Sequence, residues 1–255
     1  MSLQVWLPLN GDTQNYGLDR EVTLYQNTGA AINANGKIGS CYTFNGSSHW
    51  MQWNIDKTKY ANKPISYALW IKCGTSKASG SVLDLAADLV LAYSYTSSTV
   101  KFSYWRCYTN GSGNRAGRSN TTTTSYDASK WHHVVITFNG PINKIYVDGI
   151  LSQTFDDSSY YTNIWTPLLG GGYVKFSVGK SAGDSYWSDV SVNDVRIYDH
   201  CLSEKEVKEI AKGLVLHYKL DRNAGVGLNL LKNGFGELGN QYWGAAGDTT
   251  DIPSG

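Results

Sequence analysis

The sequence predicts an all-β protein, a sandwich or barrel of short antiparallel strands with one short helix towards the C-terminal end. Two observations lead to this prediction. Apolar residues alternate with polar ones in many short segments, which is typical of strands with one buried face. These segments are separated by turns rich in Gly, Asn and Ser, and the 255 residues include 27 Gly but only five Pro. Many short strands joined by such turns are typical of a sandwich or a barrel.

The clearest alternation lies in the middle of the chain. Segment 100–105 reads as a half-buried strand, and 132–138 and 145–147 present two further alternating faces. Asp148-Gly149 follows directly and predicts a tight hairpin, because both positions of that turn need positive φ. The same reasoning predicts strands at 5–9, 41–44, 50–53, 66–72, 82–91, 175–179 and 194–198.

Residues 109–127 differ in texture, since nearly all of them are small and polar. We expect a long exposed hairpin connection, with a solvated strand in its threonine run. Loops of this kind often carry binding in β-sandwiches, but a purely solvated loop has the same composition.

One helix is well signalled after the last clear strand. Ser203 and Glu206 form a capping box, and Leu202 with Val207 forms a hydrophobic staple. Gly213 supplies the stop. We expect this helix to close the sandwich.

Residues 214–220 repeat the apolar spacing of residues 3–9, and the chain beyond residue 223 is rich in Gly and Asn. We therefore predict one sandwich at 1–212, followed at 213–255 by a linker strand and the truncated start of another module. The alternative is a further strand of the first sheet.

The charge and the apolar pattern of the sequence argue against two classes of partner. A formal net charge of +1, with no basic stripe, argues against nucleic acid. No run of 18 apolar residues is present, so we expect no membrane insertion. The N-terminal residues also lack the features of a secretory signal.

Four widely spaced cysteines show no CxxC motif. We interpret them as buried apolar residues, with a disulfide as the alternative.

Three parts of the sequence together resemble laminin-G-like domains of the concanavalin A-like lectin/glucanase superfamily. They are KIGSCYTFNG at 37–46, the segment from Trp-His-His to Tyr-Val-Asp-Gly at 131–149, and Ser-Val-Gly at 177–179 followed by the strand 194–198 and the helix start at 202–203. The resemblance implies a two-sheet antiparallel jelly roll, and a function in glycan or protein recognition. Fold alone does not give function, because glycosidases share it.

A second resemblance concerns the join to the next module. Residues 209–220 followed by 229–233 are similar to phage tail and minor structural proteins. This resemblance implies a lectin-like domain of a virion (phage tail) or of an extracellular or cell-surface protein. Its partner would be a glycan or a host cell-surface receptor, and other virion proteins are further candidates. The alternative is a virion structural or protein–protein interaction domain without sugar binding.

Catalysis is not expected. Glycosidases of this fold place two carboxylates on either side of the scissile bond, and in the retaining members both are Glu. This chain has no Glu between residues 22 and 203. Asp84 and Asp88 are the only close carboxylate pair that we considered in their place, and a turn or edge role suits them equally. A glycoside hydrolase is therefore the least favoured function.

No cofactor is required by any motif. Members of the family often carry a structural Ca²⁺, for which Asp12 and Asp194 are candidate ligands because the first and last strands are neighbours in the family fold. His132 and His133 are adjacent in a predicted strand, so they face opposite sides and are not expected to share one metal.

Sugar binding uses flat aromatic faces beside polar groups that bind hydroxyls. Trp6, Trp70 and Trp131 are expected in the core. The candidate ligand-binding residues are Trp50, Trp53, Tyr93, Tyr95, Tyr104, Trp105, Arg106, Tyr186 and Trp187. For each of them the alternative is a place in the core or at a subunit contact.

Overall fold

The computed structural model describes residues 2–60, 63–85, 88–109, 115–160, 173–181 and 186–213. The chain divides into two compact units, Met1–Leu214 and Val215–Gly255. The second unit lies outside the described residues, so the predicted second module and the repeat at 214–220 stay predictions. None of the helices in the described part is long and apolar enough to span a membrane.

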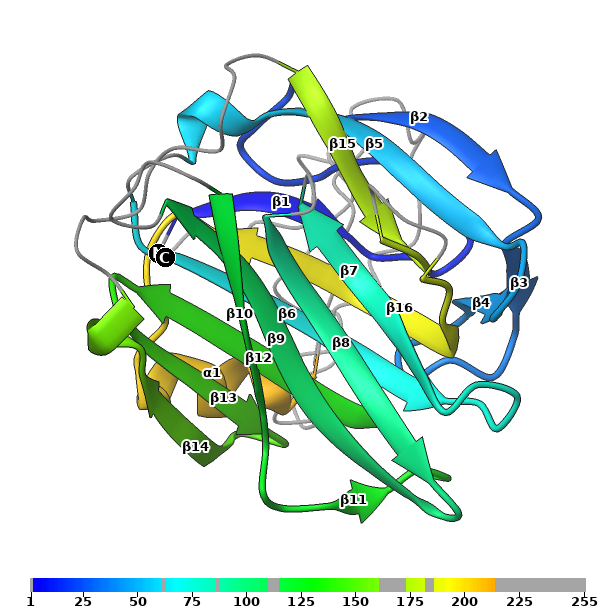
Figure 1. Cartoon of the computed structure of the whole chain (residues 1–255). Coiled ribbons are helices and arrows are strands. Elements are labelled where there is room, and N and C mark those ends of the chain that lie inside the picture. The colour runs from blue at the N-terminus through cyan, green and yellow to red at the C-terminus, as the bar shows by residue number, and fades with distance from the viewer. Residues whose placement is uncertain are drawn as a thin grey trace, which may run out of the picture. The chain divides into compact units, whose positions relative to one another are not determined.

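Two antiparallel sheets lie face to face, with β7, β8, β9 and β10 in front of β6, β12 and β16 in Figure 1. The first sheet contains, in spatial order, β14 (Ile150–Asp156), β13 (Ile142–Val147), β12 (His132–Asn139), β6 (Ile65–Cys73), β16 (Asp189–Tyr198), β4 (Cys41–Asn45) and β3 (Ala31–Asn33), and β1 (Leu3–Leu7) pairs with β16. The second sheet contains β10 (Arg115–Thr121), β9 (Thr99–Thr109), β8 (Leu89–Thr96), β7 (Ser79–Leu85), β15 (Tyr173–Val178), β5 (Trp50–Asp56) and β2 (Thr23–Thr28), and β11 (Tyr126–Asp127) pairs with β9. Two short 3-10 turns, η1 (Lys57–Lys59) and η2 (Ser158–Tyr160), complete the sandwich. The predicted all-β two-sheet architecture is confirmed.

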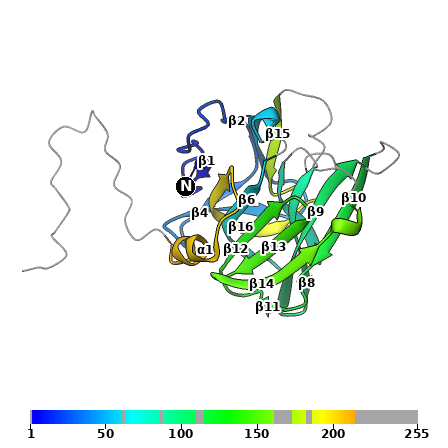
Figure 2. The same ribbon diagram turned by 90° about the vertical axis from the view of Figure 1, so that its left-hand side faces the viewer.

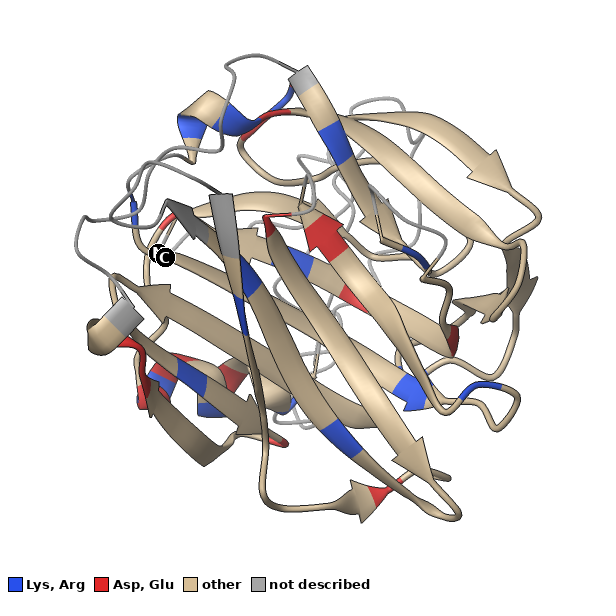
Figure 3. Cartoon of the chain, in the orientation of Figure 1, with Lys and Arg blue, Asp and Glu red and all other residues tan. Residues whose placement is uncertain are grey.

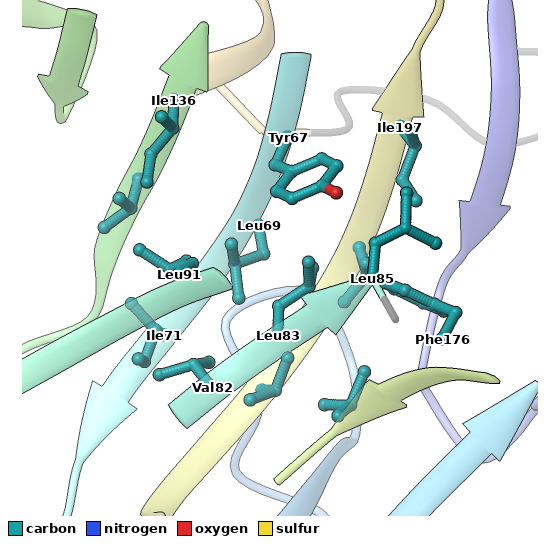
Figure 4. Close-up of a cluster of buried hydrophobic side chains, with 14 of the residues drawn as sticks. Tyr67, Leu69, Ile71, Val82, Leu83, Leu85, Leu91, Ile136, Phe176 and Ile197 are labelled. Atoms are coloured by element: carbon teal, nitrogen blue, oxygen red, sulfur yellow. The ribbon is translucent and has the colours of Figure 1, made fainter. Parts of the chain in front are cut away.

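The core fills the space between the sheets because successive strand residues point to opposite faces. Leu83 and Leu85 of β7 meet Leu69 and Ile71 of β6 there, and all four are at most 1% exposed (Figure 4). Phe176 of β15 closes the cluster at the side of β5. The alternation seen in the sequence is therefore the alternation between this core and the two outer faces.

A smaller apolar cluster covers part of the outer face of the first sheet. Helix α1 (Glu204–Ala211) lies beside β12, β13 and β14, on the side away from β8 and β9 (Figure 2). Ser203 and Glu206 form the predicted capping box, and Leu202 and Val207 are buried together in this cluster. Gly213 follows the helix at φ +80, as the stop signal predicts.

The Tyr-Val-Asp-Gly segment at 146–149 forms a hairpin turn and hydrogen-bonds to the neighbouring strand β12. Asp148 and Gly149 form the predicted hairpin turn between β13 and β14, with φ of +53 and +82. The Asp148 carboxylate accepts a bond from the backbone N–H of His133 and pairs with Nδ1 of His132, both at 2.8 Å. His132 packs towards Phe102 inside the sandwich and His133 against Trp70 outside it. The prediction that the two histidines face opposite sides is confirmed.

Two strand predictions are wrong in extent. Residues 82–91 are not one strand, because β7 ends at Leu85 and β8 begins at Leu89. Asp88 lies at the turn, where its N–H donates to the carbonyl of Leu85. The polar stretch at 109–127 holds β10, which begins at Arg115 and ends where the threonine run begins. Apolar content alone does not mark a turn inside an apolar run, nor a strand inside a polar one.

Cys41 and Cys73 are free thiols and are buried, whereas Cys107 and Cys201 are half-buried. Burial raises the pKa of the Cys73 thiol to about 12. Cys41 and Cys73 therefore behave as small apolar residues of the core, as predicted, while the prediction of burial does not hold for Cys107 and Cys201.

We expect His133 to make the fold sensitive to acid. Its burial, with the nearby Arg196 guanidinium, lowers its pKa from 6.5 to about 3. Between these values the unfolded chain binds a proton and the folded chain does not, so the free energy of unfolding decreases as pH falls through this window. His133→Phe should remove much of the loss between about pH 7 and about pH 4, measured as the urea midpoint at each pH. An unchanged pH dependence in the variant would assign the acid sensitivity elsewhere.

Candidate functional site

Five of the nine predicted ligand-binding side chains belong to the core. Trp53, Tyr93, Tyr104 and Arg106 are at most 1% exposed, and Tyr95 is half-buried and packs against the core. The burial of Trp53, Tyr93, Tyr104 and Arg106 leaves no side-chain surface open to a sugar, so these four do not fit the predicted role. Tyr95 keeps part of its side chain accessible.

The reason is strand parity. In β5, Met51, Trp53 and Ile55 are buried between the sheets, so Trp50 at an odd separation from Trp53 points outward. In β9, Tyr104 points inward, so Trp105 points outward. A strand rich in aromatics on both faces gives no sequence signal that tells these roles apart.

Tyr104 and Arg106 belong to a buried polar network at one end of the sandwich. The Arg106 guanidinium donates from Nη1 to the carbonyl of Gly140 at 2.6 Å and to Oδ1 of Asn143 at 2.7 Å. Tyr104 donates to Oδ2 of Asp157 at 2.7 Å, and burial and this carboxylate raise the pKa of Tyr104. These bonds account for both residues without a ligand.

Two predicted aromatics, Trp50 and Trp187, contact the same lysine near the N-terminal end of β5. The ammonium of Lys180 lies 4.3 Å from the ring centroid of Trp50 and 5.1 Å from that of Trp187. Trp50 and Trp187 are half-buried, and the adjoining Tyr186 is 45% exposed. The two indoles and the lysine thus form one accessible cluster.

A second aromatic–lysine pair lies further along the same outer face. Lys175 of β15 is opposite Asn54 of β5, and its ammonium lies 3.0 Å from the ring centroid of Tyr25. Lys175 also donates to Oδ1 of Asn54 at 2.6 Å. Tyr25 is the extra residue of a register shift in β2 and is 55% exposed. A bulge of this kind redirects a side chain, and here it directs Tyr25 over the lysine.

We call these five residues, Tyr25, Trp50, Lys175, Lys180 and Trp187, the aromatic–lysine face. Trp50 and Asn54 are four residues apart in one strand, which separates the two clusters by about 13 Å. The exposed amide of Gln26 lies between them, opposite Gln52. The face therefore offers rings at two points and amide groups between them.

Local sequence explains how the first cluster is held. Before Trp50, Oδ1 of Asn45 accepts from the backbone N–H groups of Ser47, Ser48 and His49 at 2.9–3.0 Å. Asn45, in the Phe-Asn-Gly end of the segment 37–46, thus orders the loop that leads into β5.

Gly179 positions the other half of that cluster. It has φ +91, and a Cβ there would lie 2.3 Å from the Phe44 ring, so only glycine fits. After it, Ser188 N–H donates to the Gly179 carbonyl at 3.0 Å and Ser181 N–H to that of Tyr186 at 3.2 Å. This short ladder sets Lys180 opposite Trp187.

Buried polar side chains support the face from neighbouring strands. Gln52 donates to Oγ of Ser177 at 2.9 Å, and Ser181 donates to Oδ2 of Asp84 at 2.8 Å. All four are at most 8% exposed. They therefore fix the strands and the turn in place and are not themselves contact residues.

Trp105 stands apart from the aromatic–lysine face. It lies on β9, four strands from β5 in the same sheet, which corresponds to about 19 Å. A Cβ at Gly117 would lie 2.4 Å from its indole, so the ring lies across that glycine. Trp105 is a half-buried residue of the outer face at its other end.

The predicted calcium ligands do not meet as a pair of available carboxylates. Asp194 is 4% exposed, and its carboxylate accepts from Trp6 Nε1 at 2.8 Å and pairs with the Arg196 guanidinium at 2.9 Å. Asp12 instead accepts from the Tyr16 hydroxyl and the Gln14 backbone. No group of three or more His, Cys, Asp or Glu in the described ranges is placed to hold a metal ion. Asp194 is thus already neutralised by arginine, which does not fit a calcium ligand.

Tyr25, Lys175 and Lys180 were not predicted from the sequence. The alternation of 23–28 is weak, because this edge strand is exposed on both faces. The one available signal was the position of each lysine, Lys175 within a predicted strand and Lys180 directly after its terminal glycine.

Comparisons with known proteins agree with this fold. The family described as concanavalin A-like lectin/glucanases superfamily (Laminin_G_3) matches residues 45–208. Domain 4 of AbnA, a GH43 extracellular arabinanase from Geobacillus stearothermophilus solved with arabinotriose, superposes with a TM-score of 0.59 at 17% identity, covering 82% of this chain and 98% of that one. No curated protein sequence matches the chain.

Two toxin domains are also similar in structure. The binding domain of Paraclostridial Mosquitocidal Protein 1 has a TM-score of 0.60 at 13% identity and covers 82% of this chain and 52% of that one. The receptor binding domain of botulinum neurotoxin C/D mosaic serotype has 0.57 at 14%, covering 84% and 52%. This chain thus spans about half the length of those two domains. At these identities the likeness concerns the fold, and the matched residues show that the chain belongs to the concanavalin A-like lectin/glucanases superfamily.

Proposed function

We propose that this chain is a non-catalytic carbohydrate-recognition domain and that the aromatic–lysine face holds the saccharide. The observation that carries the proposal is the gathering of Trp50, Trp187 and Tyr25 on one outer face, beside exposed amides. The apolar C–H side of a sugar ring packs on a flat aromatic ring, and side-chain amides bind its hydroxyl groups.

The separation within the face favours an oligosaccharide over a single sugar. The clusters at Trp50 and at Tyr25 are about 13 Å apart, which is longer than one sugar ring. Gln26 and Asn54 lie between or beside them as hydrogen-bonding groups. The similar arabinanase domain was solved with arabinotriose, and this supports a short saccharide chain as the class of ligand.

The absence of catalysis is part of the proposal. The chain has no Glu from 22 to 203, so the Glu pair of retaining glycosidases is missing from the sandwich. Asp84 and Asp88 were considered as substitutes for this pair. They do not lie on one strand, because β7 ends at Leu85, between them.

We place the domain on a phage tail or on an extracellular or cell-surface protein, where its partner is a glycan or a receptor that carries one. The support is the similarity of residues 209–220 and 229–233 to phage tail proteins. Recognition of a host surface by a virion uses the same chemistry as a secreted lectin, so the proposed site serves either setting.

A glycan array with wild-type protein, Trp50→Ala and Trp105→Ala tests this function. We expect the wild type to retain at least one oligosaccharide and Trp50→Ala to bind it about five- to thirtyfold more weakly, since stacking on an aromatic ring contributes about 1–2 kcal/mol. Trp105→Ala is the matched control, because this tryptophan is also half-buried on the outer face of the same sheet. Loss of binding on Trp105→Ala alone would contradict the assigned face, and silence of the wild type on the array would contradict the function.

A protein–protein interaction domain without sugar affinity is the second candidate. It is favoured by exposed apolar side chains on strands at the sheet edges, namely Leu24 (40%), Ile32 (58%) and Ile150 (69%). Exposed edge strands can pair with another chain. This function predicts a defined oligomer by light scattering together with an empty array, and a monomer would contradict it.

A further inference from the structure

The two lysines of the aromatic–lysine face carry an inference about the class of saccharide. This inference rests on the proposed function. Each lysine lies over a ring that a neutral sugar would need for stacking: Lys180 over Trp50 and Trp187, and Lys175 over Tyr25. A cation held over an aromatic ring is stabilised there by the electron-rich face, so displacing it opposes the stacking of a neutral sugar.

Neither lysine forms an ion pair with another described residue. Other lysines do so, such as Lys59 with Asp19 and Lys212 with Glu209. Within the part of the chain that the structure describes, the Lys175 ammonium donates to a neutral amide, Oδ1 of Asn54. Both ammonium groups therefore keep capacity for an anion.

The two carboxylates described on these strands, Asp84 and Asp56, each accept hydrogen bonds from the protein. Asp84 of β7 is fully buried and accepts from Ser181. Asp56, at the end of β5, accepts from the backbone and hydroxyl of Thr58, and these two bonds lower its pKa. Figure 3 shows the lysine on β15 and the acidic residue on β7 as separate blue and red segments. Among the described residues, the Trp50 end of the face therefore presents the positive charge of Lys180, while Asp56 keeps its negative charge at the other end of β5.

We propose that the ligand is an acidic oligosaccharide with carboxylate groups on separated residues. One carboxylate would pair with Lys180 and another with Lys175, while Trp50, Trp187 and Tyr25 pack beside the rings. The separation of about 13 Å between the two clusters requires a chain of sugars and excludes a single acidic monosaccharide from both contacts. Bonds between ammonium and carboxylate are charge-assisted, which makes these two contacts stronger than those to neutral hydroxyls.

Acidic oligomers and their own methyl esters provide the test. Hexamers of galacturonate and of mannuronate are compared with their methyl-esterified forms, which keep the sugar skeleton and lose the charge; an oligomer of sialic acid is compared in the same way. Binding is measured by interferometry on the full chain. We expect at least one acid to bind at least tenfold more tightly than its ester, with the preference shrinking as salt is raised.

Variants then locate the charge. Lys180→Ala and Lys175→Ala should each weaken binding of the preferred acid by about tenfold, and Lys180→Arg should retain most of it. Lys101→Ala is the matched control, because Lys101 is a half-buried lysine on β9 of the same sheet.

Three outcomes would overturn the inference: equal binding of acid and ester, unchanged binding in both lysine-to-alanine variants, or binding of neutral saccharides alone. If a neutral saccharide binds and Trp50→Ala abolishes it, the proposed function stands and the acidic ligand class falls. If no acid, ester or array saccharide binds the wild type, both fall.

Discussion

Asp157→Ala should lower the free energy of unfolding by about 3–5 kcal/mol, because it removes a buried carboxylate that accepts several hydrogen bonds. Asp157 is 1% exposed and accepts from Tyr104 at 2.7 Å and from the amides of Asn143 and Asn120 at 2.9 Å. Nε of Arg118 lies 3.5 Å from Oδ1 of Asp157, the oxygen that accepts from Asn120. Without the carboxylate the buried Tyr104 hydroxyl loses its acceptor, and each of the two amides loses one of its acceptors while keeping the Tyr104 oxygen. A buried unsatisfied donor is costly.

Thermal and urea unfolding measure this effect, and we expect Tm to fall by about 10 °C. Asp156→Ala is the control, since Asp156 is the preceding aspartate but is exposed and accepts only from Ser158 in its own turn. That substitution should cost about 1 kcal/mol or less. Equal losses in the two variants would contradict the role given to the buried network.

Trp53→Ala should destabilise the sandwich by about 3–5 kcal/mol without selectively affecting ligand binding. The Trp53 side chain is fully buried, its ring centroid lies 5.8 Å from that of Phe176, and its Nε1 donates to the Thr13 carbonyl at 3.0 Å. Its removal leaves a cavity between β5 and β15 and an acceptor without its donor.

Trp50→Ala is the matched comparison, because the same residue type stands three positions earlier and faces outward. We expect Trp50→Ala to cost about 1 kcal/mol or less in stability but to weaken saccharide binding by about five- to thirtyfold. Trp53→Ala should therefore lower the urea midpoint without a selective loss of array signal. Trp50→Ala should lower the array signal with little change in the urea midpoint. A Trp53→Ala protein of unchanged stability would show that its burial has been misassigned.

The fold was largely predictable because it depends on local patterns. Period-two alternation marked most strands, and the motif residues turned out to be structural: Asn45 orders a loop, Asp148 ties the hairpin to two histidines, and Ser203 caps the helix. Each acts on the backbone of close or paired neighbours. The strand break between Leu85 and Leu89 was missed because no Gly or Pro marks it.

The site was predictable only in part. Trp50, Tyr186 and Trp187 were chosen for being aromatic in strands or loops, and so was Trp53, which lies in the core. Which of two tryptophans in one strand faces outward depends on register against the other sheet, and a single sequence does not reveal that register when both faces are aromatic. The lysines were missed because their role depends on strands distant in the sequence.

The most direct test of the central claim is fluorine NMR of the protein labelled with fluorotryptophan, whose nine tryptophans are assigned by single Trp→Phe variants. The saccharide that the array retains most strongly is then titrated in. The account predicts that the resonances of Trp50 and Trp187 shift with a common saturation curve, while those of Trp53 and Trp105 stay in place. Shifts confined to Trp105, or saturable binding that leaves Trp50 and Trp187 unchanged, would contradict it.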